Sequence, residues 1–248
     1  MLLKNRDDDV RMQYPNLFSS LPDCRLDYRN EYHYLNLLFN KIVLGKHSLQ
    51  TTVPFSQFWI GNSKADFLII NGKAVVYEIK TDLDNLRRLE GQLTDYYKAF
   101  PLVYVVCGEG YLPVLSSLLR DKPTGLMCLS RKDHFHLVKQ AEEYWGSIDK
   151  DILFGLLRKP EYTQLVLDLG SGIPKCKEVD YYERCEEIVM EFPVSVIYKN
   201  VLKLLKKRDI MKRNEMIEKI PYQYRAWYYF SDFTKKERQL VQTQLGEV

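Results

Sequence analysis

The sequence predicts an α/β fold in which a mixed central sheet is flanked by helices and followed by a mainly helical C-terminal half. Residues 102–107 form a continuous apolar run, as expected of a strand covered on both faces. Residues 65–70 and 74–80 are two short apolar segments joined at Asn71 and Gly72, which is a hairpin signal. The elements follow one another as helix, three strands, helix, strand, helix and strand, an order typical of a sheet with helices packed on it.

The remaining elements follow from apolar spacing and from residues that start or stop helices. We expect a helix from residue 30, where apolar residues recur at helical spacing, and a strand over residues 49–60, which are rich in Thr, Val, Phe and Trp. A second helix is expected over residues 85–98, with Asp84 as its N-cap. The last expected elements are a helix over residues 112–119 and strands over residues 125–129 and 134–138.

The pattern changes beyond residue 131 and becomes mainly helical. We therefore expect an N-terminal arm or short helix over residues 1–29, an α/β core over residues 30–145, and a helical region with a basic helix over residues 146–248.

Composition excludes several classes of protein. The chain has 248 residues, of which 46% are hydrophobic and 28% charged, so neither a fibre nor a disordered chain is indicated. Its 36 basic and 33 acidic residues leave a net charge of +3, so a nucleic-acid surface must come from local clustering. No window approaches the roughly 20 apolar residues of a membrane span, and the first residues lack a signal-peptide run. The five cysteines show no metal-type spacing, and we expect a cytoplasmic protein without a membrane partner.

Two carboxylates and a lysine lie at the ends of neighbouring apolar segments. Asp66 begins the first segment, and Glu78 and Lys80 end the second. Hydrolysis of a phosphodiester needs a hard cation bound by oxygens, a polarised water and a positive group near the developing charge. Asp66 and Glu78 can supply the oxygens. Lys80 shares the face of Glu78 because side chains repeat every two residues along a strand, so the pattern favours a metal-dependent phosphodiesterase site.

The length of the hairpin connection decides whether the two carboxylates meet. A two-residue loop of Asn71 and Gly72 places Asp66 and Glu78 on opposite faces of the sheet. A three-residue loop over residues 70–72, with Gly72 as a left-handed bulge residue, places them on one face and leaves the other face apolar. We therefore expect an odd-length or bulged connection, and a two-residue hairpin would count against the site.

The pattern resembles the PD-(D/E)XK nuclease superfamily. Its members carry an acidic residue on the first core helix, an Asp on the second core strand, Glu-x-Lys on the third strand, and a helix after that. The matching residues here are Glu31, Asp66, Glu78, Ile79 and Lys80. The next helix carries Gln92 and Tyr96, similar to the Gln-x3-Tyr element of RecB-like members, and the wider pattern resembles bacterial and mobile-element proteins of poorly defined role. The resemblance covers residues 30–108, and Ala65 stands where many members have proline.

The resemblance implies a restriction-endonuclease-like core and metal-dependent cleavage of nucleic acid, with DNA favoured over RNA. It implies that Asp66, Glu78 and the backbone carbonyl of Ile79 ligate Mg²⁺ or Mn²⁺. Glu31 would reach the same metal through water, or a second one. A helix N-terminal acid favoured by the helix dipole explains Glu31 equally well.

The resemblance also assigns supporting roles. Lys80 would assist the attacking water, Gln92 would orient the site, and Tyr96 would brace it or contact the nucleic acid. Tyr96 also fits the apolar stripe of its helix, which makes it a core candidate. Arg87 and Arg88 are candidates for phosphate contacts, although a solvated helix face explains them as well.

A second candidate nucleic-acid surface lies in the C-terminal half. Apolar residues interleave there with basic ones, which indicates an amphipathic basic helix beside an aromatic cluster at residues 222–230. Basic charge beside aromatic rings suits phosphate and base contacts. A solvated face next to an aromatic core, or a helix that binds a protein partner, remains open. The basic candidates are Lys203, Lys206, Lys207 and Arg208.

The sequence therefore leaves three functional readings. The first is a metal-dependent nuclease. The second is a nuclease-like module that binds nucleic acid or protein without catalytic activity of its own. In the third, the C-terminal half is a protein-interaction domain and the first half is its platform.

Overall fold

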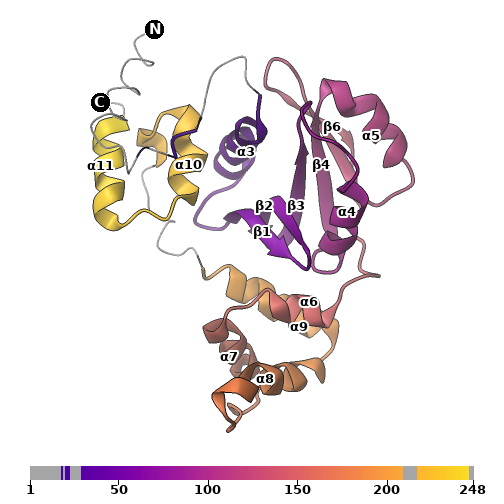
Figure 1. The fold of residues 1–248 in the computed structure, drawn as a ribbon, viewed down its shortest axis with the longest axis vertical. Coiled ribbons are helices and arrows are strands. Elements are labelled where there is room, and N and C mark those ends of the chain that lie inside the picture. Colours follow the sequence, from indigo (N-terminus) through magenta and orange to yellow (C-terminus); the bar gives the residue numbers. More distant parts are fainter. Residues whose placement is uncertain (1–17, 19, 23–28, 209–216, 246–248) are drawn as a thin grey trace. The chain divides into compact units, whose positions relative to one another are not determined.

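The structure, a computed structural model, describes residues 18, 20–22, 29–208 and 217–245 (Figure 1). The chain divides into two compact units: unit 1 comprises Met1–Leu49 and Asn214–Val248, and unit 2 comprises Gln50–Arg213. The boundary expected near residue 145 thus falls inside unit 2. Most of the arm expected over residues 1–29 lies outside the described residues.

Unit 2 is built on a six-stranded mixed sheet in the order β1-β2-β3-β4-β5-β6. The β3–β4 and β4–β5 pairs are parallel and the other three pairs are antiparallel. This confirms the expected α/β class with a mixed sheet. The strands are β1 (Val53–Ile60), β2 (Ser63–Asn71), β3 (Lys73–Lys80), β4 (Leu102–Gly108), β5 (Gly125–Leu129) and β6 (Phe135–Lys139).

The connection between β2 and β3 has an odd length, as the sequence predicted. Asn71 pairs with Lys73, so Gly72 alone makes the turn. Its φ of 71° lies in the left-handed region, which glycine adopts without the steric penalty of a Cβ atom. The loop is one residue long and not three, but the parity is the one expected, and the ladder pairs Leu68 with Val76. Continued by one residue, this register places Asp66 opposite Glu78.

Helices α4 (Leu89–Tyr97) and α5 (Leu112–Leu118) cover one face of the sheet (Figure 1). The residues of α4 that point at the sheet recur at helical spacing, because one stripe of the helix must be apolar to be buried there. The buried side chains of this layer include Leu68, Ile70, Val76, Leu93, Tyr96, Val103 and Val105.

Helix α4 begins later than the sequence predicted, and Asp84 does not cap it. The helix begins at Leu89, and its N-cap residue Arg88 makes no side-chain capping bond. Asp84 instead accepts hydrogen bonds from the backbone N–H and the hydroxyl of Thr81, both at 2.8 Å. A short polar side chain that stabilises a local turn in this way competes with helix formation, which accounts for the error.

The helical part of unit 2 comprises α6 (Lys150–Gly155), α7 (Lys159–Asp168), α8 (Tyr181–Met190) and α9 (Val194–Leu205). Their apolar side chains belong to the same buried cluster as those of the sheet and α4. Asp149 caps α6 through its carboxylate, and its own N–H donates to the carbonyl of Lys98 at the end of α4. No helix in the described ranges is both long and apolar enough to cross a membrane.

Unit 1 contains α3 (Glu31–Leu38), which continues as a π-helix over Phe39–Leu44, together with α10 (Arg225–Phe230) and α11 (Lys235–Leu245). The amides of the buried residues Asn36 and Asn40 donate to the carbonyl of Tyr222 at 3.0 and 3.2 Å. The rings of Phe39 and Tyr229 lie 5.0 Å apart. Most of the aromatic cluster at residues 222–230 is buried, so it forms the core of this unit.

A glycine in the sheet gives a test of this fold. Gly125 pairs with Tyr104 across β4 and β5, and a Cβ atom at Gly125 would lie 2.3 Å from the Tyr104 ring and 2.8 Å from the backbone of Ala141. We expect Gly125→Ala to lower the free energy of unfolding by about 1–3 kcal/mol, because the ring and the chain must both shift. Urea denaturation measures this change.

Gly91 is the matched control, since a Cβ atom there meets nothing within 4 Å and the residue lies inside α4. Gly91→Ala should raise the free energy of unfolding by up to about 1 kcal/mol through helix propensity. Equal effects of the two substitutions would contradict the packing of Tyr104 over Gly125.

Candidate functional site

The end of β3 holds a buried ion pair. Glu78 is 1% exposed, and the Lys80 ammonium lies 2.6 Å from its Oε1. Both side chains face α4, as the two-residue repeat of a strand requires. A buried charge is tolerated only when it is paired and hydrogen-bonded. The contacts of Lys80 with Gln92 and of Glu78 with Tyr96, both on α4, confirm the prediction that Glu78 and Lys80 share one face.

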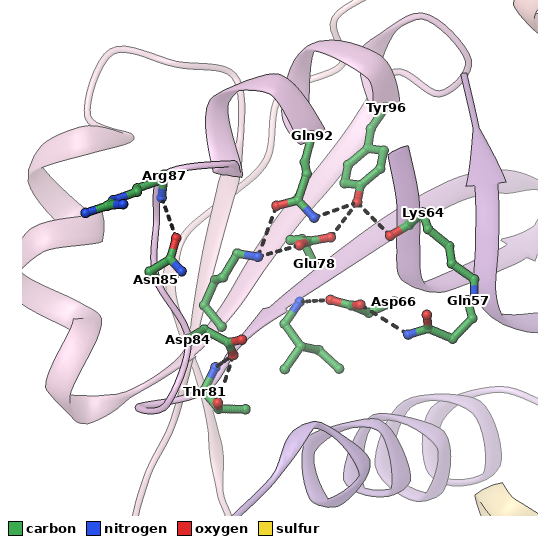
Figure 2. A network of polar contacts seen from close by, with 12 residues as sticks. Gln57, Lys64, Asp66, Glu78, Thr81, Asp84, Asn85, Arg87, Gln92 and Tyr96 are labelled. Atoms are coloured by element: carbon green, nitrogen blue, oxygen red, sulfur yellow. Dashed lines mark hydrogen bonds and ion pairs between the residues drawn. The ribbon is translucent and has the colours of Figure 1, made fainter. Parts of the chain in front are cut away.

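Two polar residues of α4 complete the pair from above the sheet (Figure 2). Gln92 accepts a hydrogen bond from Lys80 at 3.0 Å, and the Tyr96 hydroxyl lies 2.6 Å from Oε2 of Glu78. The Gln92 amide also lies 3.5 Å from that hydroxyl. Gln92 and Tyr96 are four positions apart in the sequence, so they occupy one face of the helix, which here is the face over β3.

The Tyr96 hydroxyl donates a hydrogen bond to Glu78. Burial, followed by the negative charge of Glu78 and the hydrogen bond to it, raises the pKa of Tyr96 far above its ordinary value, and the charge of Asp66 adds to this. The hydroxyl therefore keeps its proton. Since Tyr96 is fully buried, it braces the carboxylate, and the alternative that it contacts nucleic acid from the surface is not supported by its position.

Asp66 lies where the β2–β3 ladder ends. The last backbone pair is Phe67 with Tyr77, and beyond it the Asp66 carboxylate accepts the N–H of Ile79 at 2.7 Å. Figure 2 shows the contacts of Asp66 and those of Glu78 as two neighbouring groups. The half-buried Asp66 is more accessible than Glu78.

Gln57 is a contact of Asp66 that the sequence analysis missed. Its amide lies 3.3 Å from Oδ1 of Asp66, and its φ of 52° puts a non-glycine residue in the left-handed region. Such a conformation costs on the order of 1–3 kcal/mol and tends to occur at functional sites. No pattern in the sequence marks this residue, because the contact depends on the pairing of β1 with β2.

The donor set suits a hard cation but is sparse. Among the described residues, no three His, Cys, Asp or Glu side chains gather closely enough to hold a metal ion. The candidate ligands are the carboxylates of Asp66 and Glu78. The backbone carbonyl of Ile79 is a further candidate at the same strand end. Mg²⁺ is commonly held by one or two carboxylates, with water and substrate phosphate completing its shell. These residues fit that pattern.

Other predicted residues make contacts of their own. Glu31 is the first residue of α3 and belongs to unit 1, so its role at the site in unit 2 stays a prediction. Arg87 and Arg88 are exposed at the beginning of α4. Their position leaves both earlier explanations open, a phosphate contact or a solvated surface.

The predicted basic residues of the C-terminal half differ in their exposure and in their partners. Lys203 and Lys207 are exposed, and Lys203 forms an ion pair with Asp168 at 3.1 Å. Lys206 is half-buried. Arg208 instead makes two contacts of 2.5 Å with Glu161 and donates to the carbonyl of Leu156.

Arg208 thus serves the packing of unit 2. Its guanidinium also lies over the Phe58 ring, 5.9 Å from the centroid. Burial acts to raise the pKa of Glu161, but the hydrogen bonds from Arg208 and from the Arg158 backbone hold it below its ordinary value. The prediction of a nucleic-acid contact overlooked this partner, which lies 47 residues away in the sequence.

Two neighbouring tyrosines test whether Glu78 depends on its hydroxyl partner. Tyr96→Phe should lower the free energy of unfolding by about 1.5–3 kcal/mol, because a buried carboxylate oxygen loses its donor. Tyr97→Phe removes a buried hydrogen bond between neutral groups, with Thr124 at 2.9 Å, and should cost only about 0.5–1.5 kcal/mol. Urea denaturation compares the two. A loss in Tyr96→Phe no greater than in Tyr97→Phe would contradict the charged contact.

Comparisons with known proteins give a family and one distant structure. The chain is 23% identical over 159 residues to protein cII of Enterobacteria phage P4, covering 63% of this chain and 59% of that protein. It thus spans less than two thirds of that relative. A solved structure of a protein of unknown function from Silicibacter pomeroyi covers 51% of this chain and 87% of its own, with 14% identity and a TM-score of 0.32.

The sequence profile of the family described as bacteriophage P4 protein cII matches residues 24–224. The match includes most of the chain and all of unit 2. The chain therefore belongs to the bacteriophage P4 protein cII family.

Proposed function

We propose that this protein is a metal-dependent nuclease that hydrolyses phosphodiester bonds of nucleic acid, with DNA as its substrate. The observation that carries the proposal is the end of β3. There the Lys80 ammonium pairs with Glu78, and Asp66 accepts the N–H of Ile79, the residue between them. The similarity of this arrangement to the PD-(D/E)XK superfamily supports it.

Mg²⁺ or Mn²⁺ would be held by Asp66, Glu78 and the carbonyl of Ile79. When bound, such a cation polarises a phosphate and lowers the pKa of a coordinated water. Both oxygens of Glu78 already accept hydrogen bonds, from Lys80 and Tyr96. A carboxylate has about four acceptor positions, so these contacts orient Glu78 and leave acceptor capacity on it.

Lys80 supplies the positive group of the site. An ammonium has three N–H donors, and Glu78 and Gln92 receive two of them. We assign the third to a phosphate oxygen or to the attacking water. Because Lys80 is 7% exposed, its charge acts in surroundings of low dielectric, where charge stabilisation is stronger than in water.

Asp66 and Gln57 form the more accessible side of the site. The hydrogen bond from Ile79 fixes one oxygen of Asp66, and Gln57 contacts the other. A cation entering from solvent would meet Asp66 first. The exposed residues Arg87, Arg88 and Lys207 are the candidates for phosphate contacts outside the reacting group.

The second candidate function is a nuclease-like module that binds nucleic acid or protein without cleaving it. The sparse donor set favours this alternative, since within the described chain no three His, Cys, Asp or Glu side chains gather to hold a metal ion. The two candidates differ in one measurable property, which is metal-dependent cleavage by the purified chain.

The direct test measures cleavage of linear and circular DNA, single- and double-stranded, and of RNA, with Mg²⁺ or Mn²⁺. We expect DNA cleavage that EDTA abolishes. Asp66→Asn should lower the rate on the order of 10²-fold or more, because a charged ligand becomes neutral. The double variant Glu78→Gln with Lys80→Met should do the same while leaving no unpaired buried charge.

Glu90→Gln is the control, since it neutralises a carboxylate of α4 whose side chain is 81% exposed. It should cleave like the wild type. Metal-dependent cleavage that survives Asp66→Asn would place the chemistry elsewhere. The absence of cleavage from a folded protein on every substrate would favour the binding module.

A further inference from the structure

An exposed tryptophan lies at the end of the β1–β2 hairpin, beside the site. Trp59 is 63% exposed and pairs in register with Lys64. The Lys64 ammonium lies 5.6 Å from the centre of the indole ring. A large aromatic surface and a positive charge therefore meet on two neighbouring strands.

The backbone of Lys64 is connected to Glu78 through Tyr96. The Tyr96 hydroxyl that contacts Glu78 also lies 3.1 Å from the carbonyl oxygen of Lys64. Lys64 precedes Asp66 by two residues, a span of about 7 Å along a strand. Trp59 follows Gln57, the contact of Asp66, by the same interval. Trp59 and Lys64 thus lie two residues along their strands from Gln57 and Asp66.

The hairpin end that carries Trp59 is anchored to α4. The Ser63 hydroxyl donates to Asp95 at 2.7 Å, and Lys98 forms an ion pair with the same carboxylate at 2.9 Å. Burial acts to raise the pKa of Asp95, but the hydrogen bonds from Lys98 and Ser63 hold it below its ordinary value. Asp95 is therefore ionised at neutral pH and anchors the turn to α4.

An indole and a lysine in this arrangement suit one ligand chemistry. A nucleobase stacks on an aromatic ring with little dependence on its identity, and a lysine neutralises the phosphate beside it. In a duplex the base faces are stacked on each other, so only an unpaired nucleotide presents a face to the ring.

We propose that Trp59 and Lys64 form a subsite for one unpaired nucleotide, so that the protein acts on single-stranded nucleic acid. The indole stacks on the base and Lys64 contacts its phosphate, which holds the neighbouring phosphodiester at Asp66 and Glu78. This proposal rests on the proposed function for the reaction, but the binding it describes needs no metal.

The test uses the full chain in EDTA, so that binding is observed without cleavage. The protein has three tryptophans, and Trp145, 47% exposed, is the matched control for Trp59. A 12-nucleotide oligothymidylate should quench the fluorescence of the wild type and of Trp145→Phe. It should not quench Trp59→Phe.

Affinity gives a second readout. Trp59→Ala should weaken binding of the oligonucleotide about 5- to 100-fold, the range of one base–aromatic stack. Lys64→Gln should reduce the slope of log affinity against log salt by about 0.7, the share of one phosphate contact on a single strand. A duplex of the same length should bind Trp59→Ala and the wild type equally.

Three outcomes would overturn the subsite: binding unchanged in Trp59→Ala, quenching retained in Trp59→Phe, or a Trp59-dependent preference for the duplex. Cleavage that does not depend on Trp59 would leave the nuclease in place and remove the subsite. Binding that depends on Trp59 without any cleavage would support the subsite and remove the nuclease. Because Trp59 is exposed, its variants should fold, and circular dichroism checks this.

Discussion

The ion pair between Glu78 and Lys80 is the constraint on which the rest of the site depends. Removing two charges from water is unfavourable by several kcal/mol per ion unless their partners compensate. Here Tyr96 and Gln92 supply those partners from α4, and the apolar layer beneath that helix holds them in place. Replacing the pair with apolar residues would often stabilise a protein. Two buried charges at a strand end are therefore weak evidence for stability, which agrees with the catalytic role we propose for them.

The geometry of the site depends on a single glycine. Gly72 closes the β2–β3 connection in one residue, and a change of one residue in that loop would turn Asp66 away from Glu78. The parallel pairing of β3 with β4 requires a crossover, and α4 provides it directly after the Glu78–Lys80 segment. Open α/β sheets commonly bind ligands at the carboxyl ends of their parallel strands, and the network lies at such an end.

Local patterns in the sequence predicted much of this arrangement. Strand β5 was predicted with its observed bounds, because a short apolar run between turn residues has few other solutions. The odd connection and the spacing of Gln92 and Tyr96 followed from the periodicities of strand and helix. Contacts between distant segments could not be predicted in this way. The Arg208–Glu161 pair, the Gln57–Asp66 contact and the joining of both chain ends in unit 1 all depend on tertiary packing. The expected cap at Asp84 was wrong for a local reason. Its side chain accepts a hydrogen bond from Thr81 and stabilises a turn there, and it does not cap the helix.

The central claim is that Asp66 and Glu78 together hold a divalent cation, and titration calorimetry with Mn²⁺ tests it without requiring any substrate. We expect one saturable site in the wild type and in Glu90→Gln, and its loss in Asp66→Asn. Folding of each protein is checked by circular dichroism. Binding that is unchanged in Asp66→Asn, or no binding by the folded wild type, would contradict the claim.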